Sequence, residues 1–420
     1  MAIASPLVST DSQNPHSEQE VEFTPVFANL DDFDPADSHP YMMPDGGEPI
    51  YSATSMMKNE WASQGYPGVD IATSPQSQTS GRACTPYNEG DRVTAFPTSD
   101  GTKDVTVEKT TSTAAFMVQT GSTLSSTVLN NWASTWDSTV YPTMMTYFGK
   151  DYFDGRGIAA PDVDNNCQIE IVIYQIPDGT NNIGGYFSSM MAPTREVIYI
   201  DIDDAPLAWS KVILAHELQH LLHNALDPYE NRWINEGAAD MAAFLCFGGS
   251  NTLYGHVNAW TEASDVSVRW WKGERIADYG GGFIFLLYLA EHLGGGPAIR
   301  ALVQDSSTGA RGIEDLARNP IGATPGVIGR DFIDIWTNFT IAATLDSDQG
   351  IYGMSNLLLT PSCSPGEFCR IQPAATNNDW LTPWSSTGNP IEGWGVRVFK
   401  FTPGSAAPAP LTMRFTGDVP

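Results

Sequence analysis

Ala215-His216-Glu217-Leu218-Gln219-His220-Leu221-Leu222-His223 is the stretch on which the interpretation of this sequence depends. It reads His-Glu-x-x-His inside an apolar run typical of a helix. A helix of about 3.6 residues per turn places His216 and His220 on one face, close enough to hold one metal ion. Glu217 lies one residue round, where it can reach a water beside the metal rather than the metal. The stretch predicts a two-histidine metal site with an adjacent carboxylate.

The residues that follow supply a third ligand. Catalytic zinc takes three protein ligands and keeps one open position. Asp227-Pro228 ends the first helix, because proline cannot continue it, and a second apolar run, Ile234 to Phe247, brings Glu236 towards the same face. Asp240 shares that face and can orient a ligand imidazole through its free N–H. Hydrolysis by zinc, with Glu217 as general base, is the chemistry indicated.

The second stretch also carries a family resemblance. Asn235-Glu236-Gly237-Ala238-Ala239-Asp240 resembles the Asn-Glu-x-x-Ser-Asp box of thermolysin-like enzymes, the gluzincin metallopeptidases. Ala239 stands where that box usually has serine, and the 15 residues between His220 and Glu236 are a few fewer than in those enzymes. The match to hyicolysin-type secreted neutral metallopeptidases is closer, and that to immune inhibitor A-like ones more distant. The resemblance covers roughly residues 125 to 345.

The resemblance implies an α+β gluzincin-like catalytic domain, with a small β-rich N-terminal subdomain and a mostly helical C-terminal one. It implies a secreted, zinc-dependent endopeptidase that acts on proteins or peptides, and we expect a monomer. The metzincin family is excluded, since it needs glycine and histidine where this chain has His223 and Leu226. His223 lies near the ligand face, as a buried neighbour or as a group facing the substrate.

Two rival functions follow from the same residues. An aminopeptidase of this group would carry an added glutamate-rich motif, which we do not find upstream. A surface-binding or adhesin-like protein with a structural zinc stays open. Chelator-sensitive digestion of casein would distinguish the peptidase from the adhesin.

The 420 residues, 41% of them hydrophobic, predict two or three domains. Residues 1–90 are rich in Ser, Pro, Asp, Gly and Gln and predict an irregular or disordered arm, for which a pro-region remnant is one interpretation. Residues 91–345 form the predicted peptidase domain. Residues 346–420, with short alternating runs, predict a small β-rich appendage.

The charge narrows the classes of partner. Forty-nine acidic against 21 basic residues give a net charge of −28, which argues against nucleic acid and anionic membranes. No apolar run approaches the length of about 18 residues that a membrane span needs. The segment Met1 to Val8 lacks the features of a signal peptide, so we expect a signal removed before this numbering begins and a secreted protein.

Further motifs lie on both sides of the metal motif. Asp162, Asp164 and Asn166 precede a predicted strand, Ile169 to Ile176, and are candidate calcium ligands, with an Asx-rich turn as the alternative. The motif lacks the glycine and glutamate of an EF-hand loop. Cys363 and Cys369 could close a disulfide hairpin, and Cys84 with Cys167 a second one, although spacing alone cannot show a pairing.

A zinc peptidase adds a hydrogen-bond donor that stabilises the oxyanion, commonly Tyr or His. The candidates are His223, His256 and Tyr279. We predict Tyr279, which precedes three glycines and an apolar helix, Phe283 to His292, in an Asp-Tyr-Gly stretch that resembles the hyicolysin-type pattern. The alternative is a tyrosine that only packs at the start of that helix. We predict that His256 lies in a loop.

Overall fold

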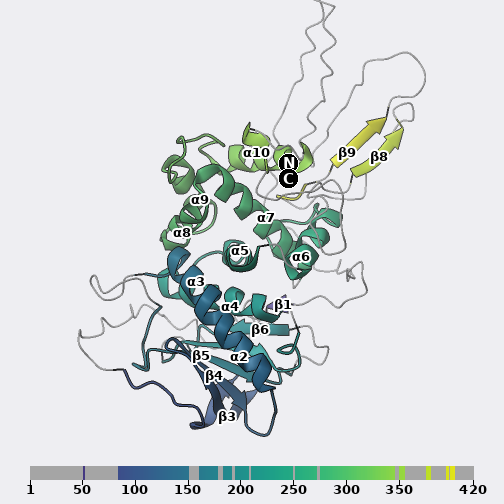
Figure 1. The fold of residues 1–420 in the computed structure, drawn as a ribbon. Coiled ribbons are helices and arrows are strands. Elements are labelled where there is room, and N and C mark those ends of the chain that lie inside the picture. Colours follow the sequence, from purple (N-terminus) through teal and green to yellow (C-terminus); the bar gives the residue numbers. More distant parts are fainter. Residues whose placement is uncertain are drawn as a thin grey trace, which may run out of the picture.

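The structure, a computed structural model, describes residues 51–52, 84–150, 160–177, 183–191, 194–207, 210–248, 251–271, 275–345, 350–354, 375–379, 394–396 and 398–402. Within these residues the chain has a mixed α+β fold, with a sheet at one end and helices above it (Figure 1). Most of the predicted N-terminal arm and C-terminal appendage, including Cys363 and Cys369, lies outside the described residues. The predicted α+β class is confirmed.

One mixed sheet forms the lower part of the molecule (Figure 1). Its strands are β1 (Tyr51–Ser52), β2 (Arg92–Thr98), β3 (Gly101–Thr110), β4 (Ala114–Gln119), β5 (Ile169–Tyr174), β6 (Ile183–Phe187) and β7 (Val197–Asp201), in the order β1-β6-β7-β5-β4-β3-β2. Strands β4, β5 and β7 run parallel, and β6 is antiparallel to β7. The outer edge of β6 pairs with β1.

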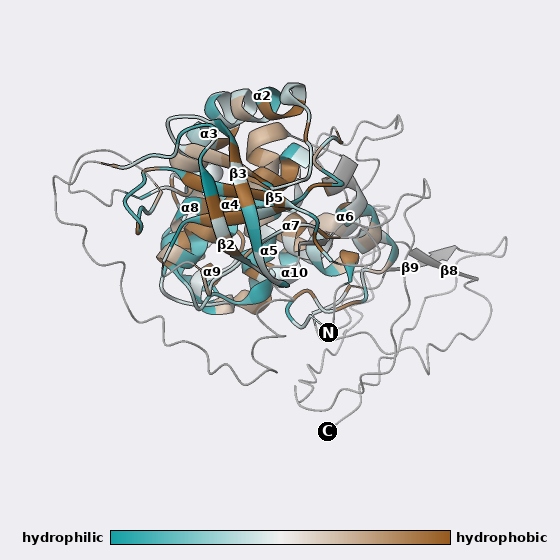
Figure 2. Cartoon of the chain, turned by 90° about the horizontal axis from the view of Figure 1, so that it is seen from below, coloured by the Kyte–Doolittle hydropathy of each residue, from teal (hydrophilic) through white to brown (hydrophobic). Residues whose placement is uncertain are grey.

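The central strands are buried on both faces, as expected for parallel strands whose sequence is continuously apolar. Phe116, Ile171 and Ile198 face the helices and belong to the main core. Their neighbours Met117 and Val172 face the opposite side and form a smaller core. Figure 2 shows hydrophobic residues on the central strands and on α4, with hydrophilic stretches on β2 and β3 nearer the viewer.

The helices lie in two parts of the chain, between β4 and β5 and after β7. They are α2 (Ser126–Thr135), a π-helical turn (Trp136–Val140), α3 (Tyr141–Tyr147), α4 (Ser210–Leu226), α5 (Arg232–Phe247), α6 (Asn251–Glu262), α7 (Ile276–Leu293), α8 (Gly296–Gln304), α9 (Ala310–Arg318) and α10 (Phe332–Leu345). Strands β8 (Ala375–Asp379) and β9 (Val398–Thr402) form a separate parallel pair. Helix α4 follows β7 and lies over β6 and β7, which places the His-Glu-x-x-His motif directly above the sheet (Figure 1).

Helix α7 contains three consecutive glycines, and two of them lie against neighbouring backbone. A Cβ on Gly280 would lie 1.9 Å from the carbonyl oxygen of His256 in α6. A Cβ on Gly282 would lie 2.9 Å from the carbonyl oxygen of Trp233, and one on Gly237 would lie 2.9 Å from the backbone of Gly282. Each glycine weakens a helix by about 1 kcal/mol relative to alanine. Here it allows α5, α6 and α7 to pack backbone against backbone.

Cys84 and Cys167 form a disulfide, one of the two pairings that the sequence allowed. Cys246 has a free thiol and is half-buried on α5. Among the described residues no single helix has the length and apolar composition of a membrane span; α7 and α8 meet that criterion only together, across a bend of 112°.

Candidate metal centre

Helices α4 and α5 bring three metal-binding side chains together. His216 and His220 project from α4, and their Nε2 atoms lie 3.3 Å and 3.2 Å from the same atom, Oε2 of Glu236 on α5. The exposed fractions of these side chains are 8%, 1% and 0%. The 3.6-residue repeat sets the two imidazoles on one face of α4, and α5, which packs against α4, sets the carboxylate opposite them.

This arrangement fits a small tetrahedral cation. Zinc–ligand bonds of about 2.0–2.1 Å give a tetrahedron with edges of about 3.3–3.4 Å, which the two Nε2–Oε2 distances match. Two nitrogens and one oxygen are a donor set that zinc accepts, and three protein ligands leave a fourth position open. The structure therefore shows a buried group able to hold a metal ion; the identity of the metal belongs to the proposal below.

Asp240 connects this group to a third histidine, His256. Its Oδ1 accepts from Nδ1 of His216 at 3.0 Å, which leaves the Nε2 lone pair of His216 directed towards Glu236. Its Oδ2 lies 2.6 Å from Nδ1 of His256. The predicted loop position of His256 is wrong, because His256 lies in α6. The His256–Asp240 contact could not be predicted from the sequence, because α6 has no clear apolar repeat.

The buried carboxylates and imidazoles of this group are electrically balanced only when protons or a cation add positive charge to them. Burial alone would lower the pKa of His216, but hydrogen bonds to Asp240 and Glu236 raise it well above its ordinary value. Burial alone would raise the pKa of Glu236, but the neighbouring His220 and the bonds from both imidazoles hold it well below its usual range. A divalent cation can take the place of these protons.

Glu217 lies beside the three ligands and does not replace any of them. It is fully buried, and its charge adds to the effects that raise the pKa of His216. On its other side Glu217 packs over β6, where a Cβ on Gly185 would lie 3.3 Å from its Cγ. The same Cβ would lie 2.7 Å from both Cγ2 of Ile213 and the carbonyl oxygen of Tyr199, so the glycine allows α4 to pack closely against the sheet beside Glu217.

Tyr279 packs against His256 and Trp271. It is fully buried in α7, which begins at Ile276 rather than at Phe283 as predicted. The Tyr279 ring centroid lies 5.1 Å from that of His256, which in turn contacts Asp240, the hydrogen-bond partner of His216 Nδ1. This packing is compatible with the structural alternative for Tyr279. The oxyanion role stays a prediction.

Substituting Tyr279 by Phe tests that role. If the hydroxyl stabilises the oxyanion, Tyr279→Phe retains its metal and its KM and lowers kcat by roughly 10–10³, a loss of about 1.4–4 kcal/mol. Steady-state kinetics with metal analysis of the same sample measure both quantities. A Tyr279→Phe protein with the kcat of the wild type would assign the residue to packing and make His256 the next residue to test.

The candidate calcium ligands lie in the segment that leads into β5. Ligand atoms of Asp162, Asp164 and Glu196 lie within 4.8 Å of one another. Asn166 donates from Nδ2 to Asp164, and its Oδ1 accepts the N–H of Gln168, which are the contacts of an Asx turn. The structure therefore adds Glu196, at the approach to β7, which the sequence did not single out because it lies some 30 residues beyond the motif.

Glu196 gives this cluster a measurable pH dependence. Burial, together with the charges of Asp164 and Asp162, raises the pKa of Glu196 from 4.5 to about 9. Between these values the folded protein keeps a proton that the unfolded chain has lost, so the free energy of unfolding falls as pH rises, by at most about 1.4 kcal/mol per pH unit.

A calcium ion bound in place of the proton would oppose this loss. We expect millimolar Ca²⁺ to raise the melting temperature more at pH 8.5 than at pH 5.5. Glu196→Gln should flatten the pH dependence without calcium and abolish the calcium effect. Melting curves that do not change with calcium at either pH would leave the segment as an ordinary Asx turn.

Comparison with family models and with curated proteins finds no match to this sequence.

Proposed function

We propose that this protein is a secreted zinc endopeptidase of the gluzincin type, in which His216, His220 and Glu236 bind the metal. The observation that carries the proposal is the meeting of the two Nε2 atoms at one carboxylate oxygen, at 3.3 Å and 3.2 Å. The third ligand comes from the helix that follows, as in the gluzincin pattern that the sequence resembles. Glu217, on the same helix as both histidines, supplies the base that a purely structural zinc site does not need.

In this proposal the metal, Glu217 and Asp240 have different roles in hydrolysis. When bound, zinc supplies Lewis acidity, which polarises a scissile carbonyl and makes a water more acidic. Glu217 accepts the proton of the attacking water and transfers it to the leaving amine. Asp240 holds the Nδ1 proton of His216, so that the imidazole presents its Nε2 lone pair to the metal.

Two further observations support the extracellular part of the proposal. The Cys84–Cys167 disulfide is typical of proteins that mature in an oxidising compartment. The net charge of −28 disfavours nucleic acid and anionic membranes as partners. Protein or peptide chains are therefore the substrates that we propose.

Digestion of casein by the purified full chain tests the proposal directly. We expect cleavage that 1,10-phenanthroline abolishes and that Zn²⁺ restores in the dialysed sample. Two variants serve as controls. His256→Ala should lower the rate of cleavage, because His256 contacts Asp240, whereas Glu262→Gln should not, because Glu262 is exposed at the end of α6. A correctly folded protein that contains stoichiometric zinc and cleaves neither casein nor a peptide library would instead support the adhesin-like alternative.

A further inference from the structure

A second group of metal-binding side chains lies at the end of α4, one turn beyond the first. Ligand atoms of His223, Asp227 and Glu230 lie within 4.8 Å of one another. Their exposed fractions are 0%, 6% and 7%. His223 belongs to the last turn of α4, and the two acids lie in the loop that leads to α5. None of the three contributes to the group formed by His216, His220 and Glu236.

Glu230 is held in one orientation by backbone. Its Oε1 accepts the N–H of Gly309, at 2.7 Å, and the N–H of Asn231. Its Oε2 is buried and has no hydrogen-bond partner. Burial of a carboxylate oxygen without a partner is unfavourable, because the oxygen loses its hydrogen bonds to water and gains none in the protein. Burial raises the pKa of Glu230 to about 7, and the charge of Asp227 adds to this effect. A cation at Oε2 would remove both penalties.

His223 has the surroundings of a metal ligand. Its Nδ1 lies 3.0 Å from the side-chain amides of Gln219 and Asn235. Binding a metal through Nε2 requires the proton on Nδ1, which then needs an acceptor. Rotating the Gln219 amide by a half turn places Oε1 at that proton, and this oxygen is otherwise buried without a hydrogen-bond partner. The amides can therefore orient the imidazole as Asp240 orients His216.

We propose that His223, Asp227 and Glu230 bind a second divalent transition-metal ion. One imidazole and two carboxylates suit zinc or manganese better than calcium, which prefers oxygen ligands alone. The inference does not depend on peptidase activity, since the ion would have a structural role. It would tie the end of α4 to the start of α5 and to Gly309, and so fix the position of Glu236 relative to the two histidines of the first site.

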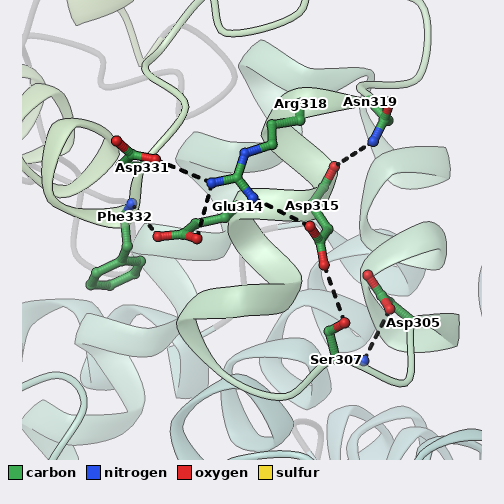
Figure 3. A network of polar contacts seen from close by, with 8 residues as sticks. All are labelled: Asp305, Ser307, Glu314, Asp315, Arg318, Asn319, Asp331 and Phe332. Atoms are coloured by element: carbon green, nitrogen blue, oxygen red, sulfur yellow. Dashed lines mark hydrogen bonds and ion pairs between the residues drawn. The ribbon is translucent and has the colours of Figure 1, made fainter.

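The loop that contributes Gly309 is itself firmly anchored (Figure 3). Asp305 accepts the N–H of Ser307 at 3.0 Å, and the Ser307 hydroxyl donates to Asp315 on α9 at 3.1 Å. Arg318 then joins Asp315 to Glu314 and Asp331 (Figure 3). The second site is therefore bounded by two fixed segments, the α4–α5 connection and the start of α9.

The competing explanation is a network in which the same three side chains share protons without a metal. Metal content distinguishes the two. After loading with Zn²⁺ and dialysis, we expect two equivalents in the full-length wild type, one in Glu230→Gln, one in His216→Ala and none in the double variant. Glu262→Gln is the control, because it removes one carboxylate that is exposed at the end of α6 and belongs to neither group, and it should keep two equivalents.

Cobalt gives a second measurement that separates the sites. In His216→Ala the first site is impaired, so visible Co²⁺ absorption should arise from the second site and disappear when His223→Gln is added. If Glu230→Gln does not fold, as judged by circular dichroism, this spectrum decides. No cobalt band in folded His216→Ala, or equal zinc content in wild type and folded Glu230→Gln, would overturn the second site. Loss of zinc only in Glu230→Gln, with none lost in His216→Ala, would instead contradict the first site.

Discussion

Glu217→Gln is expected to keep its zinc and to lose proteolysis by a factor on the order of 10²–10⁴, the usual effect of removing a general base. The amide has the size of the carboxylate and fits the same space between α4 and β6, but it cannot accept a proton from water. The first-site ligands, His216, His220 and Glu236, are unchanged in this variant. Zinc content per chain and the initial rate of peptide cleavage, measured on one preparation, give both halves of the result.

The control for this variant is Lys211→Gln, which changes a partly exposed residue at the start of the same helix that belongs to neither metal-binding group. It should retain activity within about tenfold at the first site. Loss of zinc from Glu217→Gln would show that this carboxylate is structural, and the proposed mechanism would then be wrong.

Removal of a first-site ligand is the second large effect. Structural and catalytic zinc sites need at least three protein ligands, so His216→Ala, His220→Ala or Glu236→Ala should abolish stoichiometric zinc at the first site and, with it, cleavage. Asp240→Asn removes a hydrogen-bond partner instead of a ligand, and we expect the zinc affinity to fall only roughly 10–100-fold. Competition with a chelating dye measures the difference.

A graded outcome is therefore expected, with three severe variants and one mild one. Zinc bound at the first site should raise the melting temperature of the wild type, and the alanine variants should lose this increase. Full zinc occupancy of the first site in Glu236→Ala would rule out the gluzincin arrangement, because the third ligand would have to come from elsewhere.

The sequence was sufficient to predict the elements that carry the first site. The His-Glu-x-x-His spacing and the apolar runs on either side of Asp227-Pro228 predict two helices, and the structure has them as α4 and α5. The strand predicted from Ile169 to Ile176, which is apolar over several residues, is present as β5 (Ile169–Tyr174). These are local patterns, and they determine local structure.

What the sequence could not show depends on contacts between distant segments. The contact of His256 with Asp240 joins α6 to α5, and α6 also packs against α7 at Gly280, a contact between backbones that leaves no periodic signal. Glu196 joins Asp162 because β7 pairs with β5 in the sheet. The start of α7 was placed too late, since three glycines usually indicate a break and here they allow close helix packing instead.

The contact of Gly237 with Gly282 makes the spacing of two helices a determinant of metal affinity. Glu236 precedes Gly237, on a helix held between the two histidines on one side and α7 on the other. A single methyl group at position 282 would push α5 away from α7 and so shift the carboxylate by a fraction of an ångström. Substitutions outside the metal-binding group could therefore change its affinity for a metal ion, although all three ligand residues were retained.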